Sequence, residues 1–152
     1  SGKTITIIGD VRSSRVANSC KEVFEMFGMT VCVGGPQDFL PTSADWTGNV
    51  RIGSKRAALE RSDVIMTLRI QHERKKFPDD AIAKVNLTRS MKAWQITGDD
   101  LSKFPDLRIM HPGPVNPGVE LTDDAVDGMQ SLILRQVRAG YQMRRALFSG
   151  VI

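Results

Sequence analysis

The sequence is short of cysteine and histidine. Cys20 and Cys32 are its two cysteines, and they lack the number and spacing of a disulfide framework or a zinc site. We expect both to be free thiols inside the fold. The two histidines, His72 and His111, come with no serine or cysteine nucleophile motif. The sequence therefore predicts no metal centre and no nucleophilic triad.

Long hydrophobic runs and aromatic residues are also missing. No run approaches the roughly 18 apolar residues that span a bilayer, and the N-terminus does not show the pattern of a secretory signal. Aromatic residues are 6% of the chain, which leaves little surface for base stacking, and the net charge of +4 is spread along the sequence. We expect a cytoplasmic protein that enters no membrane and binds no nucleic acid. The alternative, a basic nucleic-acid-binding domain around residues 69–76, predicts an affinity that falls steeply with salt.

What is present has the composition of one ordinary globular domain, with 41% hydrophobic and 25% charged residues in 152. Apolar and β-branched runs predict strands over residues 4–9, 29–33, 63–68 and 107–110. Helical spacing predicts helices over 14–28, 54–61 and 128–149, a short one from Thr97, and a weaker one over 81–94. The longest has an apolar stripe of Leu132, Ile133, Val137, Tyr141, Met143 and Leu147. This alternation predicts a single α/β domain, a three-layer α/β/α doubly wound (Rossmann-like) parallel sheet.

Three polar clusters follow predicted strands directly, at residues 10–15 (DVRSSR), 69–74 (RIQHER) and 111–114 (HPGP). Because a parallel sheet binds its ligands at the carboxyl ends of the strands, we expect all three to line one crevice. Arginines and the start of the first helix favour an anion there. A dinucleotide is not expected, since Arg12, Ser13 and Ser14 stand where its fingerprint needs glycines.

Arg15 and Arg69 are the best candidates for ligand contacts. Each guanidinium can hold one carboxylate through two parallel hydrogen bonds, so the pair suits a small dicarboxylate such as aspartate. Gln71 would add a neutral donor and acceptor on the same side of an extended chain. The alternative is that Arg15 is a solvated residue of the first helical turn and that Arg69 pairs with Glu73 or Asp10.

The HPGP segment predicts a rigid loop, because proline fixes the backbone and Gly113 keeps one point of the chain bare. Such a loop can present carbonyl oxygens in set directions to an NH2 group, although it could also be only a stiff connector. The basic residues Arg12, Arg74, Lys75 and Lys76 are expected to form a solvated face that concentrates an anionic substrate.

Together these motifs resemble the transcarbamylase family. GDVRSSRVANS (9–19), LRIQHER (68–74), HPGPVNPGVEL (111–121) and QVRAGYQMRRAL (136–147) are similar to the aspartate-binding domain of aspartate carbamoyltransferases. These enzymes transfer the carbamoyl group of carbamoyl phosphate to L-aspartate, giving N-carbamoyl-L-aspartate and phosphate in pyrimidine biosynthesis, without a cofactor. The resemblance implies the following roles: aspartate binding by Arg15, Arg69 and Gln71, backbone contacts to carbamoyl phosphate by Pro112 and Gly113, and support by His111, Glu73 and Arg74.

The sequence departs from the family in three places. Pro117 stands where many relatives have arginine, and Arg145 stands at a commonly apolar position. The phosphate-binding Ser-x-Arg-Thr-Arg motif does not occur within residues 1–152, so we expect a carbamoyl phosphate-binding domain outside this chain. We interpret the chain as an excised aspartate-binding domain, with no catalytic residue of its own and no activity alone.

Other readings and partners follow from the resemblance. Ornithine-specific relatives usually have a cysteine in the HPGP loop and bind a cationic side chain, which Arg69 would repel, so an ornithine-type or other transcarbamylase domain is the alternative. A non-catalytic module that senses an acidic metabolite is a further alternative. The family implies a homotrimer for the full-length protein and we expect a monomer for this domain; a regulatory chain or a dihydroorotase partner stays open.

Overall fold

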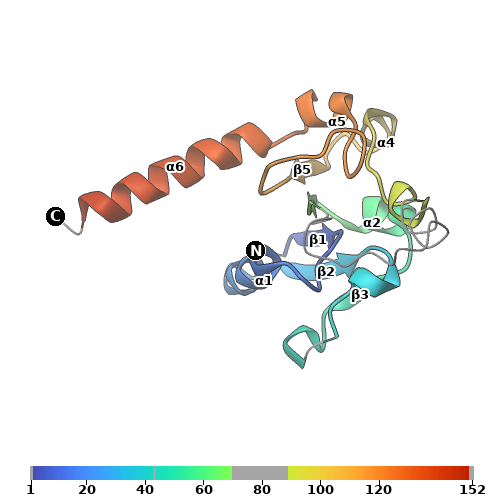
Figure 1. Ribbon diagram of the computed structural model, residues 1–152, viewed down its shortest axis with the longest axis horizontal. Coiled ribbons are helices and arrows are strands. Elements are labelled where there is room, and N and C mark those ends of the chain that lie inside the picture. Colours follow the sequence, from blue (N-terminus) through green and yellow to red (C-terminus); the bar gives the residue numbers. More distant parts are fainter. Residues whose placement is uncertain (1, 43, 70–88, 151–152) are drawn as a thin grey trace, which may run out of the picture.

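The central element of the fold is β1 (Thr4–Ile8), which pairs on both sides in a five-stranded parallel sheet of order β3-β2-β1-β4-β5 (Figure 1). The computed structural model describes residues 2–42, 44–69 and 89–150. The other strands are β2 (Thr30–Gly34), β3 (Val50–Ile52), β4 (Val64–Thr67) and β5 (Arg108–Met110). The helices are α1 (Arg15–Met26), α2 (Lys55–Arg61), α4 (Gly98–Ser102), α5 (Asp123–Asp127) and α6 (Ile133–Ser149), with short 3-10 turns η1 (Gln37–Phe39) and η2 (Ala44–Trp46).

Both faces of the sheet are covered by hydrophobic cores. Ile5 and Ile7 point to one face, where they pack in a cluster with Ala17 of α1. Alternate residues point to the other face, where Ile8 and Ile65 pack in a cluster with residues of α2, α4 and α5. Because side chains alternate along a strand, burial on both faces needs a helical layer on each side. The predicted three-layer α/β/α fold is confirmed.

The predicted elements are largely confirmed. Ser14 caps α1, where its Oγ accepts a hydrogen bond from the Ala17 N–H at 3.1 Å, and the helix ends just before Gly28, as predicted. Both cysteines are free. The prediction missed β3 and α5, which have three and five residues and are too short to show a clear period. Most of the predicted helix over 81–94 lies outside the described residues. Within its described part, residues 89–92 are helical.

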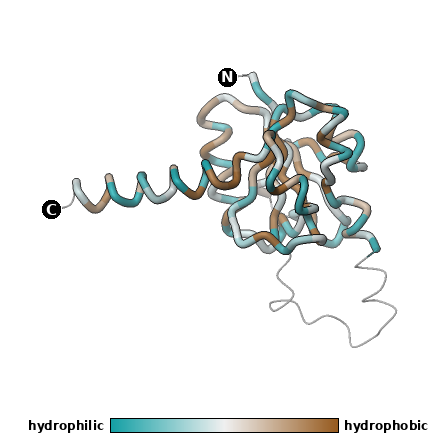
Figure 2. The backbone as a smooth tube through the Cα atoms, turned by 90° about the horizontal axis from the view of Figure 1, so that it is seen from above, coloured by the Kyte–Doolittle hydropathy of each residue, from teal (hydrophilic) through white to brown (hydrophobic). Residues whose placement is uncertain are grey.

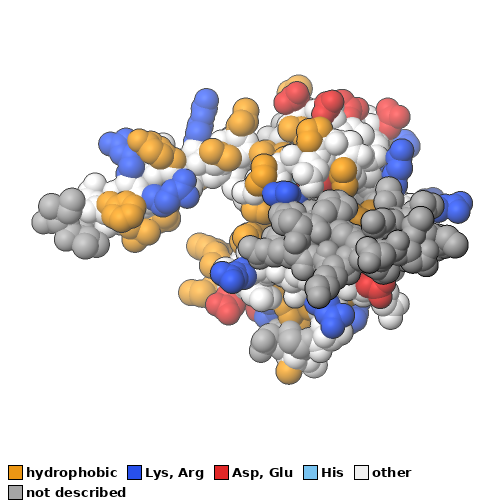
Figure 3. Space-filling view, in the orientation of Figure 1, with side chains coloured by type: hydrophobic (Ala, Val, Ile, Leu, Met, Phe, Trp, Pro, Cys, Tyr) orange, Lys and Arg blue, Asp and Glu red, His pale blue; other side chains and the backbone are white. Residues whose placement is uncertain are grey.

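Helix α6 points away from the rest of the domain (Figures 1 and 2). Ile133 in its first turn is buried, but Val137, Tyr141 and Leu147 are 55%, 57% and 61% exposed. Of the predicted apolar stripe, only its beginning packs on the domain. Hydrophobic and arginine side chains alternate along the helix (Figure 3). No helix within the described ranges has the length and hydropathy needed to cross a membrane.

Glycines allow three strand ends to come close together. Gly9 follows β1 with a φ of +119°, and a Cβ there would lie 2.8 Å from the carbonyl oxygen of Leu68 after β4. Gly34 ends β2 under the ring of Trp94, which a Cβ would approach to 2.8 Å. Gly35, with a φ of +145°, passes close to the Gly9 backbone. These contacts bring the segments after β1, β2 and β4 to one edge of the sheet.

The packing of α6 predicts an uneven effect of truncations along the helix. We expect Ile133→Ala to lower the free energy of unfolding by about 2 to 4 kcal/mol, because it opens a cavity in the core. Val137→Ala should change it by less than about 0.5 kcal/mol, since the residue is exposed. Urea unfolding followed by tryptophan fluorescence measures both. An equal loss in the two variants would mean that α6 packs on the domain in solution.

The close backbone contact at Gly9 predicts that adding one methyl group there strongly lowers the stability of the fold. Gly9→Ala should lower the free energy of unfolding by about 2 to 4 kcal/mol, because it combines a strained φ with a clash against the backbone. Gly53→Ala is the matched control, since a Cβ at Gly53 meets nothing within 4 Å and its φ lies outside the range of +20° to +160° that disfavours side chains. Thermal unfolding followed by circular dichroism compares the two, and similar midpoints would contradict the argument.

Candidate functional site

The candidate site lies at the carboxyl edge of three neighbouring strands. β1 leads into residues 10–15, β4 into Leu68 and Arg69, and β5 into the loop that begins with His111. The strand order reverses between β1 and β4, since the chain builds outward from β1 through β2 and β3 and then returns to its other side. Open α/β sheets bind their ligands at such a point. The predicted residues Gln71, Glu73 and Arg74 lie outside the described residues.

The segment after β1 is held by its own backbone and by Asp10. Asp10 is buried, and its carboxylate accepts a hydrogen bond from the Ser13 N–H at 3.3 Å. The Arg12 N–H donates to the Phe39 carbonyl at 2.8 Å, which ties this segment to the one after β2. Arg15 is therefore placed as the first residue of α1 with its side chain exposed. A guanidinium at this position reaches an anion together with the N–H groups of the helix start.

Arg69 is the first residue after the backbone pairing between β1 and β4 ends. The Leu68 N–H donates to the Ile8 carbonyl at 2.8 Å and extends the contact between β1 and β4 by one residue. Arg69 comes next and is half-buried. The structure thus places Arg69 directly after β4 and Arg15 at the start of the helix that follows the adjacent strand β1. The alternative ion pair with Glu73 falls outside the described residues.

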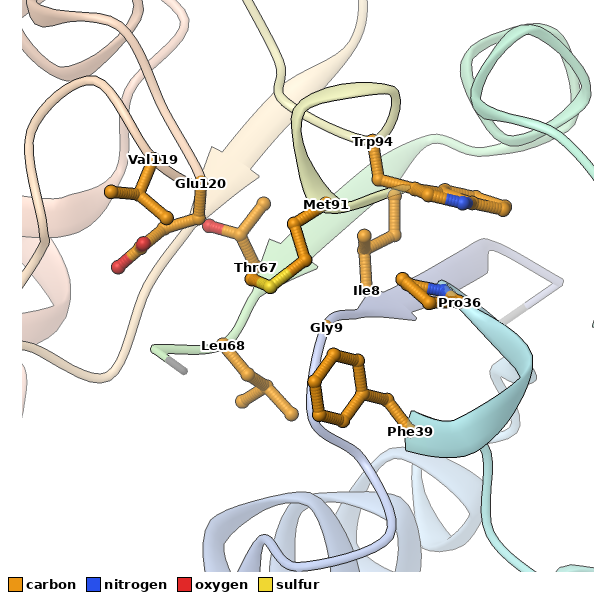
Figure 4. Close-up of a pocket in the computed structure, with 10 residues that line it drawn as sticks. All are labelled: Ile8, Gly9, Pro36, Phe39, Thr67, Leu68, Met91, Trp94, Val119 and Glu120. Atoms are coloured by element: carbon orange, nitrogen blue, oxygen red, sulfur yellow. The ribbon is translucent and has the colours of Figure 1, made fainter. Parts of the chain in front are cut away.

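A hollow of about 320 Å³, which includes space open to solvent, lies between these strand ends. Figure 4 shows Phe39, Leu68 and Met91 around it and Trp94 with Pro36 along one side, while the carboxylate of Glu120 points away from its centre. The free charge of the crevice was predicted to come mainly from arginine, which the apolar lining of the hollow does not test. The lining is mostly apolar because the side chains next to the strand ends belong to the core, and Arg69 directly follows one of them, Leu68, in the chain.

The loop after β5 is organised around a buried imidazole. His111 is 0% exposed, and its Nδ1 accepts a hydrogen bond from the Gly113 N–H at 2.8 Å. Nδ1 therefore carries no proton, and the neutral ring must carry it on Nε2. Nε2 lies 3.2 Å from Oε1 of Glu120, to which its N–H donates. The same oxygen accepts the Asn116 N–H at 2.8 Å.

Pro112 and Gly113 form the turn of this loop. Pro112 is half-buried, Gly113 is exposed with a φ of +73°, and the Gly113–Pro114 peptide bond is cis. Before the turn, the His111 N–H donates to the side-chain oxygen of Gln136 in α6 at 3.2 Å. Among the hydrogen bonds of the described residues, none ends on the carbonyl oxygen of Pro112 or Gly113. Both oxygens can therefore accept a donor from a ligand.

Sequence reasoning missed two residues that shape the site. Glu120 was quoted only as part of the motif HPGPVNPGVEL, although it is a buried acid that holds both His111 and Asn116. Its place directly before a fully buried leucine, Leu121, was the available signal, because an acid drawn into a core needs a partner. Gln136 gave no signal, since its contact with His111 spans 25 residues.

Comparison with known proteins identifies the family of this chain. Residues 1–151 match the family model of the aspartate/ornithine carbamoyltransferase Asp/Orn binding domain. The aspartate carbamoyltransferase catalytic subunit of Anaeromyxobacter sp. (strain Fw109-5) is 38% identical over 149 residues, which cover 96% of this chain and 46% of that relative. The chain thus spans about half the length of the curated relatives it matches.

Solved structures agree. The catalytic subunit of M. jannaschii aspartate transcarbamoylase has the same fold, with a TM-score of 0.81 at 22% identity, covering 97% of this chain and 49% of that one. The Trypanosoma cruzi aspartate transcarbamoylase in complex with aspartate and phosphate has a TM-score of 0.76 at 25% identity, covering 97% of this chain and 50% of that one. The resemblance of the motifs is confirmed, and the chain belongs to the family of aspartate/ornithine-binding domains of the carbamoyltransferases.

Proposed function

We propose that this chain is the aspartate-binding half of an aspartate carbamoyltransferase, which transfers the carbamoyl group of carbamoyl phosphate to L-aspartate. The observation that carries the proposal is that the segments with Arg15, with Arg69 and with Pro112 and Gly113 follow the carboxyl ends of the neighbouring strands β1, β4 and β5, in a chain of this family. These groups match the chemistry of a dicarboxylate and of an NH2 donor.

Aspartate would be held by its two carboxylates. Arg15 at the start of α1 and Arg69 after β4 each offer a guanidinium fork, and forks of this kind bind carboxylates through paired hydrogen bonds. Gln71, outside the described residues, would add a third contact. A positive site of this kind repels the cationic side chain of ornithine, which favours aspartate over ornithine. The 38% identical relative, an aspartate carbamoyltransferase catalytic subunit, supports the same choice.

Carbamoyl phosphate would contact this half through its NH2 group. The carbonyl oxygens of Pro112 and Gly113 would accept hydrogen bonds from that group, in directions set by the rigid loop. His111 would support the loop, and Glu73 with Arg74 would orient the segment that carries Arg69 and Gln71. No cofactor is needed for these contacts.

The reaction needs positioning more than a covalent intermediate. The amino group of aspartate forms a bond to the carbamoyl carbon, the bond from that carbon to the phosphate oxygen breaks, and the nitrogen gives up a proton. Holding the two substrates in line and stabilising the charge on the departing phosphate can supply most of the rate. This half would hold aspartate and the NH2 end, and a separate carbamoyl phosphate-binding half would hold the phosphate.

The remaining features belong to the same proposal. The full-length protein would be a cytoplasmic homotrimer, and this domain alone a monomer. A regulatory chain or a dihydroorotase partner is not assigned.

The proposal predicts aspartate binding that depends on Arg69. Titration of the chain with L-aspartate should shift the NMR signals of residues 9–15 and 69, with a dissociation constant of about 1 mM. Arg69→Ala should weaken binding at least about tenfold, because a charge-assisted pair of hydrogen bonds is lost. Arg138→Ala on the exposed part of α6 is the control and should bind as the unchanged chain does. Equal binding by both variants would remove Arg69 from the site.

The proposal also predicts that transfer needs the other half. The purified chain should form no N-carbamoyl-aspartate, since it has no phosphate-binding motif. Joined to the half of the Anaeromyxobacter relative that it does not cover, it should transfer the carbamoyl group to aspartate. Product formation can be followed colorimetrically. Turnover by the chain alone, or a folded chimera that binds neither substrate, would contradict the proposal.

A further inference from the structure

Glu120 and His111 form a buried polar pair beneath the loop of Pro112 and Gly113. Their exposed fractions are 7% and 0%. A buried carboxylate needs hydrogen-bond partners, and Oε1 of Glu120 has two of them, the Nε2–H of His111 at 3.2 Å and the N–H of Asn116 at 2.8 Å. The Glu120 backbone is held as well, since its carbonyl accepts the Ile96 N–H at 3.1 Å. One well-anchored oxygen therefore joins the beginning and the end of the loop.

The carboxylate also selects the form of the imidazole. A neutral histidine carries one ring proton, on either Nδ1 or Nε2. An acceptor facing Nε2 favours the proton there, which leaves Nδ1 as an acceptor. Nδ1 accepts the Gly113 N–H at 2.8 Å. With the proton on Nδ1 instead, two N–H groups would face each other and this hydrogen bond would be lost.

The hydrogen bond of Gly113 acts directly on the carbonyl of Pro112. The two groups belong to one planar peptide unit, in which N–H and C=O point in opposite directions. Because the N–H points to the buried ring, the Pro112 carbonyl oxygen points away from it, toward the outside of the loop. Gly113 is exposed and has no side chain to restrain this plane. The hydrogen bond to the ring of His111 therefore restrains the direction of the Pro112 carbonyl, in addition to the restraint that the prolines place on the backbone.

We propose that Glu120 is a positioning residue of the ligand site. By holding His111 with its proton on Nε2, it fixes the peptide plane between Pro112 and Gly113, and so aims the Pro112 carbonyl at an N–H donor of the ligand. In the proposal Glu120 acts through His111, and its carboxylate points away from the centre of the hollow (Figure 4). The identity of that ligand as carbamoyl phosphate rests on the proposed function.

The first test is the tautomer of His111 in the 152-residue chain. Two-bond nitrogen correlation NMR should show the proton on Nε2 and a hydrogen-bonded Gly113 amide. Glu120→Gln keeps an acceptor oxygen and should leave both signals nearly unchanged. Glu120→Leu is expected to populate the other tautomer and to move the Gly113 amide proton upfield. If Glu120→Leu is folded and leaves both signals unchanged, the proposal is overturned.

The second test separates positioning from stability. In the chimera with the Anaeromyxobacter half, His111→Gln places an amide where Nε2 was, so that Glu120 keeps a donor while Gly113 loses its acceptor. We expect the KM for carbamoyl phosphate to rise about tenfold, with the KM for aspartate within about twofold. Glu120→Gln should leave both KM values close to those of the unchanged chimera. An unchanged KM for carbamoyl phosphate in His111→Gln, or an equal rise in both, would overturn the proposal.

The two tests also separate this inference from the proposed function. If the folded chimera does not bind carbamoyl phosphate, the proposed function is wrong in naming carbamoyl phosphate as the ligand of the Pro112 carbonyl. The His111 tautomer and the Gly113 amide signal in Glu120→Leu would still decide whether Glu120 fixes the peptide plane between Pro112 and Gly113. Loss of the tautomer there, with no effect of His111→Gln on the KM for carbamoyl phosphate, would limit Glu120 to a structural role and overturn the proposal.

Discussion

The close backbone contact at the carboxyl end of β1 is the constraint on which the site depends. Gly9 lies against the carbonyl of Leu68 and Gly35 lies against Gly9, at distances that leave no room for a side chain at Gly9. The segments that leave β1, β2 and β4 therefore start from nearly the same place. Arg69 follows β4 directly and Arg15 begins the helix after β1, so both leave the same edge of the sheet although 54 positions separate them in the sequence.

Apolar and charged residues divide the site between them. The floor is built by core side chains such as Phe39, Leu68 and Met91, which give the hollow its shape. Arg15 is exposed and Arg69 is half-buried, and neither is among the residues that line the hollow.

The loop after β5 depends on contacts from two directions. Glu120 holds His111 from within the loop, and Gln136 at the base of α6 holds the His111 backbone. The first turn of α6 is also where Ile133 packs in the core. The base of this helix is thus part of the support of the Pro112–Gly113 turn, while the remainder of the helix is exposed.

Much of this could be predicted from the sequence, because it depends on local patterns. Apolar and β-branched runs predicted four of the five strands, Ser13 or Ser14 and Gly28 marked the ends of α1, and the alternation of strand and helix predicted the layers. The described residues that follow β1, β4 and β5 leave one edge of the sheet, which the alternation of strand and helix also predicts. The elements β3 and α5 did not, because short segments have too few residues to show a period.

Only the tertiary structure decided which atoms meet across long sequence separations. The sequence determined that the chain would have a rigid HPGP loop, since proline acts on its own backbone. It could not show that Glu120 would hold the Nε2 proton of His111, that Gln136 would hold its backbone, or that the floor of the crevice would be apolar. Those contacts arise from the packing of separate elements, and no local pattern of residues encodes their distance or direction.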